Sequence, residues 1–178
     1  MNDELPTREE TLKILKELKL KKNIIRHVIS VCEKAMDIAR KIHDNGHAIN
    51  LPLVEIGALI HDIGRSRTNK IEHAIEGAKI IEELGFSKKL CRIAETHLLG
   101  GLSEEDAMIL GLPAKSYLPE TLEEKIVCYA DKLINGSKEV SIEQRFLKWK
   151  KRFGDTILLN NSEINIRKIE AELKILMT

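Results

Sequence analysis

The stretch ALIHDIGRSRTNKIEH, residues 58–73, contains the features on which the predicted fold and site depend. It begins inside an apolar run that follows Pro52 and is typical of a buried helix. The run ends at His61 and Asp62, and Gly64 is placed to end the helix. These two side chains need a partner, because a buried carboxylate is costly unless it is paired or bound to metal.

Hydrophobic residues recur at helical spacing throughout the chain. Thr7 with Glu10 and Thr121 with Glu124 have the spacing of capping boxes. We predict helices from Thr7, after Ser103, and over about 24–43, 52–64, 70–84, 87–98, 121–133, 141–153 and 162–176. One apolar face of the helix over 141–153 would comprise Ile142, Phe146, Trp149 and Phe153. No alternating strand pattern of useful length occurs, so the predicted fold class is all-α.

The composition is typical of a globular protein. The 178 residues suffice for one domain, with 43% hydrophobic and 32% charged residues. The net charge of +1 gives no general basis for binding nucleic acid or an anionic membrane, although a local basic patch stays open. The N-terminal MNDELPTREE lacks the features of a signal peptide, and no apolar run reaches the roughly 18 residues that span a bilayer. We therefore expect a cytoplasmic protein without a membrane segment.

Five predicted helices each present a potential metal ligand toward the expected core. These ligands are His27, His61, Asp62, His73, His97 and Asp131. Any one of them alone is better explained as a hydrogen-bonded core histidine or a paired aspartate. Together they predict a metal, because no Lys or Arg falls on the same apolar faces as an alternative partner. His43 and His47 lie in a turn-like segment and are expected to be solvated.

Four imidazoles and two carboxylates without a nearby thiolate suit a divalent transition ion, namely Fe, Mn, Co, Ni or Zn. Six ligands exceed what one catalytic ion needs if it keeps positions open for water and substrate. Two ions that share a carboxylate would use all six, and such a site generates hydroxide at neutral pH and holds phosphoryl oxygens. We therefore expect one or two divalent ions.

The order H…HD…H…H…D, with HDIG at residues 61–64, resembles the HD-domain superfamily of metal-dependent phosphohydrolases, within its HDIG-bearing subgroup. The resemblance covers about residues 24–135 and implies a helical bundle with a five-helix core. To this core of a single HD domain, residues 1–178, an N-terminal helix (1–22) and C-terminal helices (141–178) would be added. The ligand spread is similar to that of small HD hydrolases that cleave symmetrical dinucleoside polyphosphates.

The resemblance also implies how the ligands are shared between ions. The ligands of one ion would be His27, His61, Asp62 and Asp131. His73 and His97 look like the extra histidines of dinuclear members, in which Asp62 would bridge the two ions.

Basic residues near the ligands are candidates for binding a substrate. Arg65 and Arg67 follow the HD dipeptide, where their guanidinium groups could bind phosphate oxygens in bidentate fashion. Related HD enzymes often have lysine at the position of Arg65, which favours phosphate contact there. Solvated loop charges are the alternative for both residues. Lys115 lies in a later loop that could cover the site.

The residues and the resemblance together predict a metal-dependent phosphohydrolase that cleaves a phosphoester or phosphoanhydride, with a nucleotide as the expected substrate. A metal-activated hydroxide would attack phosphorus, and Asp62 and Arg65 are the expected catalytic residues. Two alternatives stay open: a diiron oxygenase of the HD type, and a non-catalytic nucleotide-binding regulatory module. Self-association through the C-terminal helices also stays open.

Overall fold

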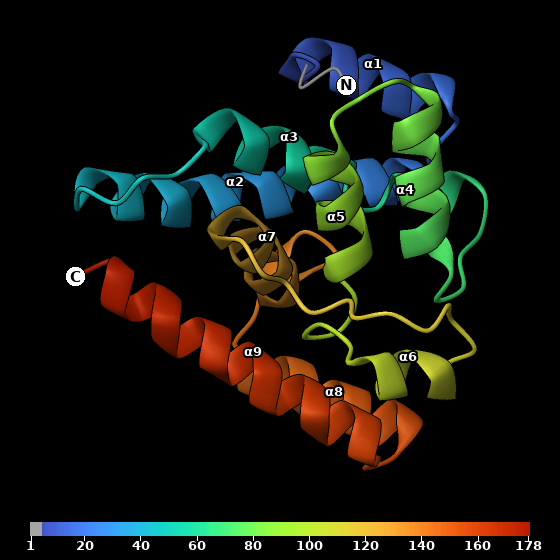
Figure 1. Cartoon of the computed structure of the whole chain (residues 1–178), viewed down its shortest axis with the longest axis vertical. Coiled ribbons are helices and arrows are strands. Elements are labelled where there is room, and N and C mark those ends of the chain that lie inside the picture. The colour runs from blue at the N-terminus through green and yellow to red at the C-terminus, as the bar shows by residue number, and fades with distance from the viewer. Residues whose placement is uncertain (1–4) are drawn as a thin grey trace.

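The computed structural model describes residues 5–178, which form helices joined by short loops (Figure 1). The α-helices of this part of the chain are α1 (Arg8–Glu17), α2 (Lys22–Asp44), α3 (Leu51–Ile60), α4 (His73–Glu83), α5 (Lys88–Thr96), α6 (Glu104–Ile109), α7 (Leu122–Leu133), α8 (Ile142–Phe153) and α9 (Ile157–Leu176). A 3-10 turn, η1 (Ile63–Ser66), follows α3. The all-α prediction is confirmed.

A short hairpin follows α7 and was not foreseen. Strand β1 (Ile134–Asn135) pairs antiparallel with β2 (Lys138–Glu139). Strands of this length leave no alternating pattern in the sequence, so periodicity could not reveal them.

The capping predictions are confirmed at α1 and only half correct at α7. The Thr7 hydroxyl accepts from the amide of Glu10, whose carboxylate accepts from the amide of Thr7. The Thr121 side chain likewise accepts from the amide of Glu124. The Glu124 carboxylate, however, accepts from the amide of Glu120 at 3.0 Å, so the second capping box does not close.

The core forms where α2 lies against α3 and α7, with α4 and α5 packed together beside α3. Helix α2 buries one apolar stripe, with 0% exposure for Val28, Val31, Ala35 and Ala39. Helix α3 is buried on nearly every side. Burial contributes about 1.5 to 3 kcal/mol for each large aliphatic side chain, so these interfaces fix the positions of the helices that carry the candidate ligands.

The HDIG turn packs against the start of α4 at backbone distance. A Cβ on Gly64 would lie 1.9 Å from the carbonyl oxygen of His73 and 2.4 Å from the amide nitrogen of Gly77. Only glycine fits there without a shift of the backbone. Gly64 therefore does not simply end α3, which stops at Ile60, but lets η1 hold His73 close to the HD dipeptide. At Gly77 a Cβ would make only an ordinary van der Waals contact, 3.4 Å from the amide nitrogen of Gly64, so the close approach depends on Gly64.

Helices α8 and α9 lie together at one end of the molecule, opposite α1 (Figure 1), and both contact α7. Ile142 and Phe146 on α8 are buried as predicted, and Trp149 is half-buried. The expectation for Phe153 is wrong: it is 59% exposed, because α8 ends there and the chain turns away. Helix α9 begins earlier than expected, because the side chain of Thr156 caps it.

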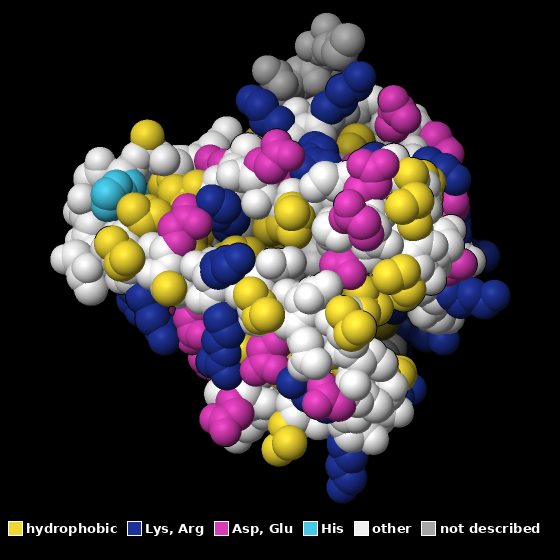
Figure 2. Space-filling model, turned by 60° about the horizontal axis from the view of Figure 1, so that its bottom comes forward, with side chains coloured by type: hydrophobic (Ala, Val, Ile, Leu, Met, Phe, Trp, Pro, Cys, Tyr) yellow, Lys and Arg dark blue, Asp and Glu magenta, His cyan; other side chains and the backbone are white. Residues whose placement is uncertain are grey.

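Charged side chains of both signs are interspersed with hydrophobic ones on the face shown in Figure 2. This mixed surface agrees with the net charge of +1. His43 and His47 are exposed, as expected. Within residues 5–178, every helix is too short or too polar to cross a bilayer.

Candidate metal centre

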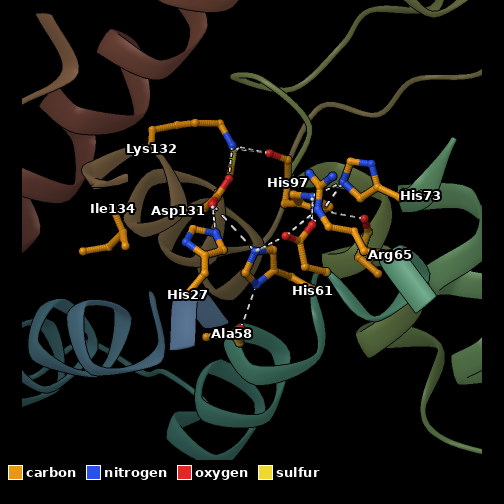
Figure 3. A network of polar contacts seen from close by, with 12 residues as sticks. His27, Ala58, His61, Arg65, His73, His97, Asp131, Lys132 and Ile134 are labelled. Carbon is orange, nitrogen blue, oxygen red and sulfur yellow. Dashed lines mark hydrogen bonds and ion pairs between the residues drawn. The ribbon is translucent and has the colours of Figure 1, made fainter. Parts of the chain in front are cut away.

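The imidazoles and carboxylates predicted as metal ligands meet at one place in the structure (Figure 3). They are His27 in α2, His61 and Asp62 after α3, His73 at the start of α4, His97 after α5 and Asp131 in the last turn of α7. Segments far apart in the sequence therefore supply one cluster of donors.

The main chain orients all four imidazoles in the same way. Nδ1 of each ring lies 2.7 to 2.9 Å from a backbone carbonyl oxygen. The pairs are His27 with Gly136, His61 with Ala58, His73 with Lys70, and His97 with Ala94. A carbonyl oxygen only accepts, so Nδ1 donates and Nε2 is the atom that each ring turns toward the cluster. Metal-binding histidines are commonly oriented by a hydrogen bond of this kind.

Asp62, His73 and His97 form what we call the inner half of the cluster. Asp62 Oδ1 lies 3.1 Å from Nε2 of His73 and 3.4 Å from Nε2 of His97. The two Nε2 atoms are 3.1 Å apart, and each of the three side chains is only 4% exposed. Two nitrogen lone pairs that face each other at this distance repel unless a proton or a cation lies between them.

His27 and Asp131 form the outer half. Nε2 of His27 lies 2.9 Å from Asp131 Oδ1, and each side chain is 15% exposed. His61 is fully buried between the two halves, with its Nε2 3.7 Å from Asp131 Oδ1 and 4.0 Å from Asp62 Oδ2. The candidate ligands therefore form a continuous row in which His61 is the shared centre.

The donor set fits a divalent transition ion. Among the described residues, His61 Nε2 and Asp62 Oδ1 are buried without a hydrogen-bond partner. Such an atom costs roughly 1 to 3 kcal/mol when nothing compensates it. Two triads each bring their donor atoms within 4.8 Å of one another: His27, His61 and Asp131, and His61, Asp62 and His97. Neutral imidazole and carboxylate are the ligands that Fe, Mn, Co, Ni and Zn accept.

The protonation states match this role. Burial acts to raise the pKa of the Asp62 carboxyl, but the imidazoles of His73, His97 and His61 outweigh it and hold the pKa well below its usual value. Burial also acts to raise the pKa of Asp131, and the Lys132 ammonium with nearby imidazoles again lowers it. Burial lowers the pKa of His97 to about 3. Two anionic carboxylates and a neutral His97 are therefore ready to bind a cation.

The sequence-based expectation that no basic side chain accompanies these carboxylates is wrong. Arg65 Nε donates to Asp62 Oδ2 at 2.7 Å. Lys132, which is 2% exposed, donates to Asp131 Oδ2 and, at 2.6 Å, to the carbonyl oxygen of His97. The long side chain of Lys132 folds back into the core beside its neighbour, which helical spacing alone could not reveal. In both carboxylates, Oδ1 faces imidazoles while a cation holds Oδ2.

A cavity of about 330 Å³ borders the cluster. His27, Asp62 and Asp131 line it together with Arg65. The lining residues that were not assigned to the site from the sequence include Asn23, Arg145 and Trp149. Asn23 lies one helical turn before His27, so the spacing could have indicated it. Arg145 and Trp149 belong to α8, and only tertiary packing brings them to the cavity.

The structure does not bring two predicted substrate contacts to this cavity. Arg67 is exposed and pairs with Glu76 at 3.3 Å and Glu83 at 2.5 Å. Lys115 pairs with Glu95 at 2.7 Å. Neither residue lines the cavity. The reason for Arg67 is its spacing, since residues two apart on a helical turn, such as Arg65 and Arg67, point in different directions.

The helical fold and the histidine and aspartate cluster define a known class of protein. The chain matches the HD domain family over residues 24–136, and it belongs to that family. The match ends just after β1, so α8 and α9 lie beyond it. Family membership and the donor set together support a metal-dependent hydrolase.

Individual relatives extend this comparison. The uncharacterized protein MJ0778 of Methanocaldococcus jannaschii is 48% identical over 163 residues, which cover 88% of this chain and 96% of that relative. A tRNA (cytidine(56)-2'-O)-methyltransferase of Picrophilus torridus is 38% identical over 95% of this chain and 47% of its own length. The chain therefore spans about half of that methyltransferase.

One solved structure shares the fold. The HD domain of the L. monocytogenes phosphodiesterase PgpH, in complex with cyclic-di-AMP, superposes with a TM-score of 0.56. The similarity covers 93% of this chain and 96% of that one, at 20% sequence identity.

Proposed function

We propose that the protein is a metal-dependent phosphohydrolase that cleaves a phosphoester or phosphoanhydride bond of a nucleotide. One observation carries the proposal: the Nε2 atoms of four oriented imidazoles and the Oδ1 atoms of two anionic carboxylates converge beside a cavity lined by Arg65. Arg65 and Lys132 each hold one oxygen of a carboxylate, but His61 Nε2 and Asp62 Oδ1 are buried without a hydrogen-bond partner, so the cluster is costly to bury unless a further cation compensates them.

The six ligands would hold one or two divalent ions. Such ions, when bound, lower the pKa of coordinated water and offset the charge on phosphate oxygens. The protein orients the ligands: backbone carbonyls fix the four imidazole rings. Arg65 and Lys132 fix the Oδ2 atoms of Asp62 and Asp131. Donors held in place before the reaction need no reorganisation during it.

Arg65 would serve both Asp62 and the substrate. Its Nε is committed to Asp62 Oδ2, while the side chain is 26% exposed and lines the cavity. The remaining N–H groups of the guanidinium are then the part that can donate to phosphate oxygens. We therefore assign catalytic roles to Asp62 and Arg65, and the phosphate contact to Arg65.

Two observations support a nucleotide as the substrate. The cavity of about 330 Å³ lies at the small end of the range of about 300 to 1,000 Å³ that is usual for ligand pockets. An HD domain of the same fold binds cyclic-di-AMP. A molecule with a phosphate group and a flat base matches both the cavity size and the mixture of guanidinium and apolar lining.

Turnover of defined substrates with defined metals tests the proposal. The protein is loaded separately with Mn, Fe, Co, Ni or Zn and assayed with nucleoside monophosphates, cyclic nucleotides and dinucleoside polyphosphates. We expect hydrolysis that requires one of these ions and stops after chelation. Oxygen-dependent turnover with a mixed-valent diiron signal would instead identify an oxygenase. Nucleotide binding without turnover under any metal would identify a regulatory module, and either result overturns the proposal.

Replacement of Arg65 tests its assigned role. Loss of a charged hydrogen-bond donor in Arg65→Ala should raise KM for a hydrolysed substrate by about 10- to 100-fold. Metal content after loading with excess metal, measured by mass spectrometry, should stay near that of the unmodified protein, because loss of the supporting contact to Asp62 weakens metal affinity without removing a ligand. If metal content collapses instead, Arg65 supports Asp62 structurally and its assignment to the substrate fails.

A further inference from the structure

Helix α8 contributes to the cavity although it lies beyond the part of the chain that matches the HD domain family. Two of its residues, Arg145 and Trp149, line the cavity together with the ligands His27 and Asp131. These two residues are one helical turn apart and therefore lie on the same face of α8. The cavity thus joins the donor cluster to a wall that lies outside the family match.

Arg145 fixes α8 against the end of α7. Its Nε donates to the carbonyl oxygen of Lys132 at 2.9 Å, and its Nη2 donates to the carbonyl oxygens of Asp131, at 3.3 Å, and Ile134. These carbonyls are at the end of α7, where a cation is favourable. The side chain that anchors α8 thereby holds the segment that carries Asp131.

Trp149 is held in a defined orientation by its neighbours. The Arg145 guanidinium lies 5.5 Å from the centre of the Trp149 ring, and the Phe146 ring packs edge-on against it at 5.2 Å. The indole is half-buried against the core and still reaches the cavity. A large apolar ring with fixed orientation loses little entropy when a ligand binds.

The rest of the cavity wall has two chemical parts. Arg65 and the metal-ligand candidates make one part cationic when a metal is bound, which suits an anion. Ile24, Ile134 and Trp149 make an apolar part, and Asn23 adds an amide that can donate and accept hydrogen bonds. An anionic group joined to a flat, partly apolar ring with polar edges would match both parts.

We propose that Trp149 is a specificity-determining residue that stacks on the base of a nucleotide whose phosphate group lies at the metal centre. The inference rests on the proposed function and deepens it by naming the residue that distinguishes a nucleotide from a simple phosphate ester. Aromatic stacking tolerates any base, because every base has a π face. Arg145 is a positioning residue in this arrangement, since its guanidinium anchors α8 and packs on the indole.

Fluorescence gives a direct readout, because Trp149 is the only tryptophan in the chain. The metal-loaded protein is titrated with adenosine 5'-monophosphate, ribose 5-phosphate and inorganic phosphate. We expect a saturable change in tryptophan emission with the nucleotide and none with the other two probes. Equal changes in emission with the nucleotide and with ribose 5-phosphate would overturn the inference. So would an unchanged emission when calorimetry shows that the nucleotide binds.

Variants at this position provide the second arm. Trp149→Leu should weaken binding of adenosine 5'-monophosphate about tenfold, as expected for loss of one base stack, and leave ribose 5-phosphate binding unchanged. Trp149→Phe should retain most of the affinity, which guards against a merely structural effect. Phe153→Leu on the same helix is the matched control, since Phe153 is 59% exposed and does not line the cavity.

The outcome separates this inference from the proposed function. If Trp149→Leu weakens both probes equally, or neither, while metal-dependent hydrolysis persists, the stacking role fails and the phosphohydrolase stands. If the nucleotide shows the stacking signal but no metal supports hydrolysis, the hydrolase proposal fails and the base-binding wall stands.

Discussion

The inner and outer halves of the candidate metal centre hold their carboxylates in the same way but differ in exposure. In each, Oδ1 faces imidazole nitrogens and a cation binds Oδ2: Arg65 on Asp62, and Lys132 on Asp131. The side chains of the inner half are 4% exposed, whereas those of the outer half are 15% exposed. The same chemistry is therefore built once in the core and once at the edge of the cavity.

The difference has a local origin in the helices. The inner half is built at helix ends, where Gly64 lets the HDIG turn press against the start of α4. The outer half is built on the faces of α2 and of the last turn of α7 that border the cavity. A ligand in the cavity meets the outer half directly, and of the inner half only Asp62 lines the cavity. We therefore expect the outer half to contact the substrate and the inner half to set the position and charge of Asp62.

The largest effect should follow from Asp62→Ala. Asp62 Oδ1 faces His73 and His97, and Asp62 Oδ2 lies 4.0 Å from Nε2 of His61. The Asp62 side chain also lines the cavity. Its loss should remove nearly all bound metal and reduce hydrolysis by more than about 100-fold, which exceeds the usual effect of residues that only support a ligand. Metal analysis and a phosphate-release assay on the same preparation measure both quantities.

Asp106→Ala is the matched control for removal of a buried carboxylate. Asp106 is 5% exposed and accepts a hydrogen bond from Asn161, away from the metal centre. The Asp106→Ala variant should retain full metal content. A fully active Asp62→Ala, or an equal loss of metal in both variants, would contradict the assignment of Asp62 as a metal ligand.

Removal of one histidine from each half should separate the two halves. His73→Ala takes a donor from the inner half, and His27→Ala takes one from the outer half. If two ions bind, each variant should lose about one ion and keep the other, with the greater loss of turnover in His27→Ala because His27 borders the cavity. Complete loss of metal in both variants would show one coupled site in place of two.

The six candidate ligands could be predicted because the signal for each lies in a short stretch of sequence. Histidines are few, they fall on apolar helical faces, and the HDIG letters mark a helix end. The helix boundaries followed from caps such as Thr7, and even the misplaced start of α9 has a local cause in Thr156. What could be predicted was therefore the identity of the donors and the helices that carry them.

The partners of these donors could not be predicted, because tertiary packing decides them. Lys132 reaches Asp131 only because its stem folds into the core, and Trp149 reaches the cavity only because Arg145 anchors α8 on α7. Neither contact leaves a periodic signal. The different roles of the inner and outer halves are likewise a property of packing, because both halves consist of the same residue types, histidine and aspartate.

A smaller effect should follow from Lys132→Met, which removes the cation that supports Asp131 of the outer half. Met preserves the apolar stem and removes the ammonium that holds Asp131 Oδ2 and the carbonyl oxygen of His97. Loss of such a supporting contact commonly costs about 10- to 100-fold in metal affinity. Competition with a chromophoric chelator measures the affinity. Lys125→Met on the same helix, where the lysine pairs with Glu172 at the surface, should leave it unchanged. Equal affinities in all three proteins would show that Lys132 only fills space.

The smallest effect is expected from Arg67→Ala, and its value lies in the contrast with Arg65. Arg67 is exposed, pairs with Glu76 and Glu83, and does not line the cavity. Metal content and KM should both remain within error of the unmodified protein, whereas Arg65→Ala raises KM. Steady-state kinetics at matched metal loading make the comparison. A rise in KM for Arg67→Ala similar to that for Arg65→Ala would mean that the loop after HDIG rearranges on substrate binding. Both arginines would then act on the phosphate, and the separation by side-chain direction would be lost.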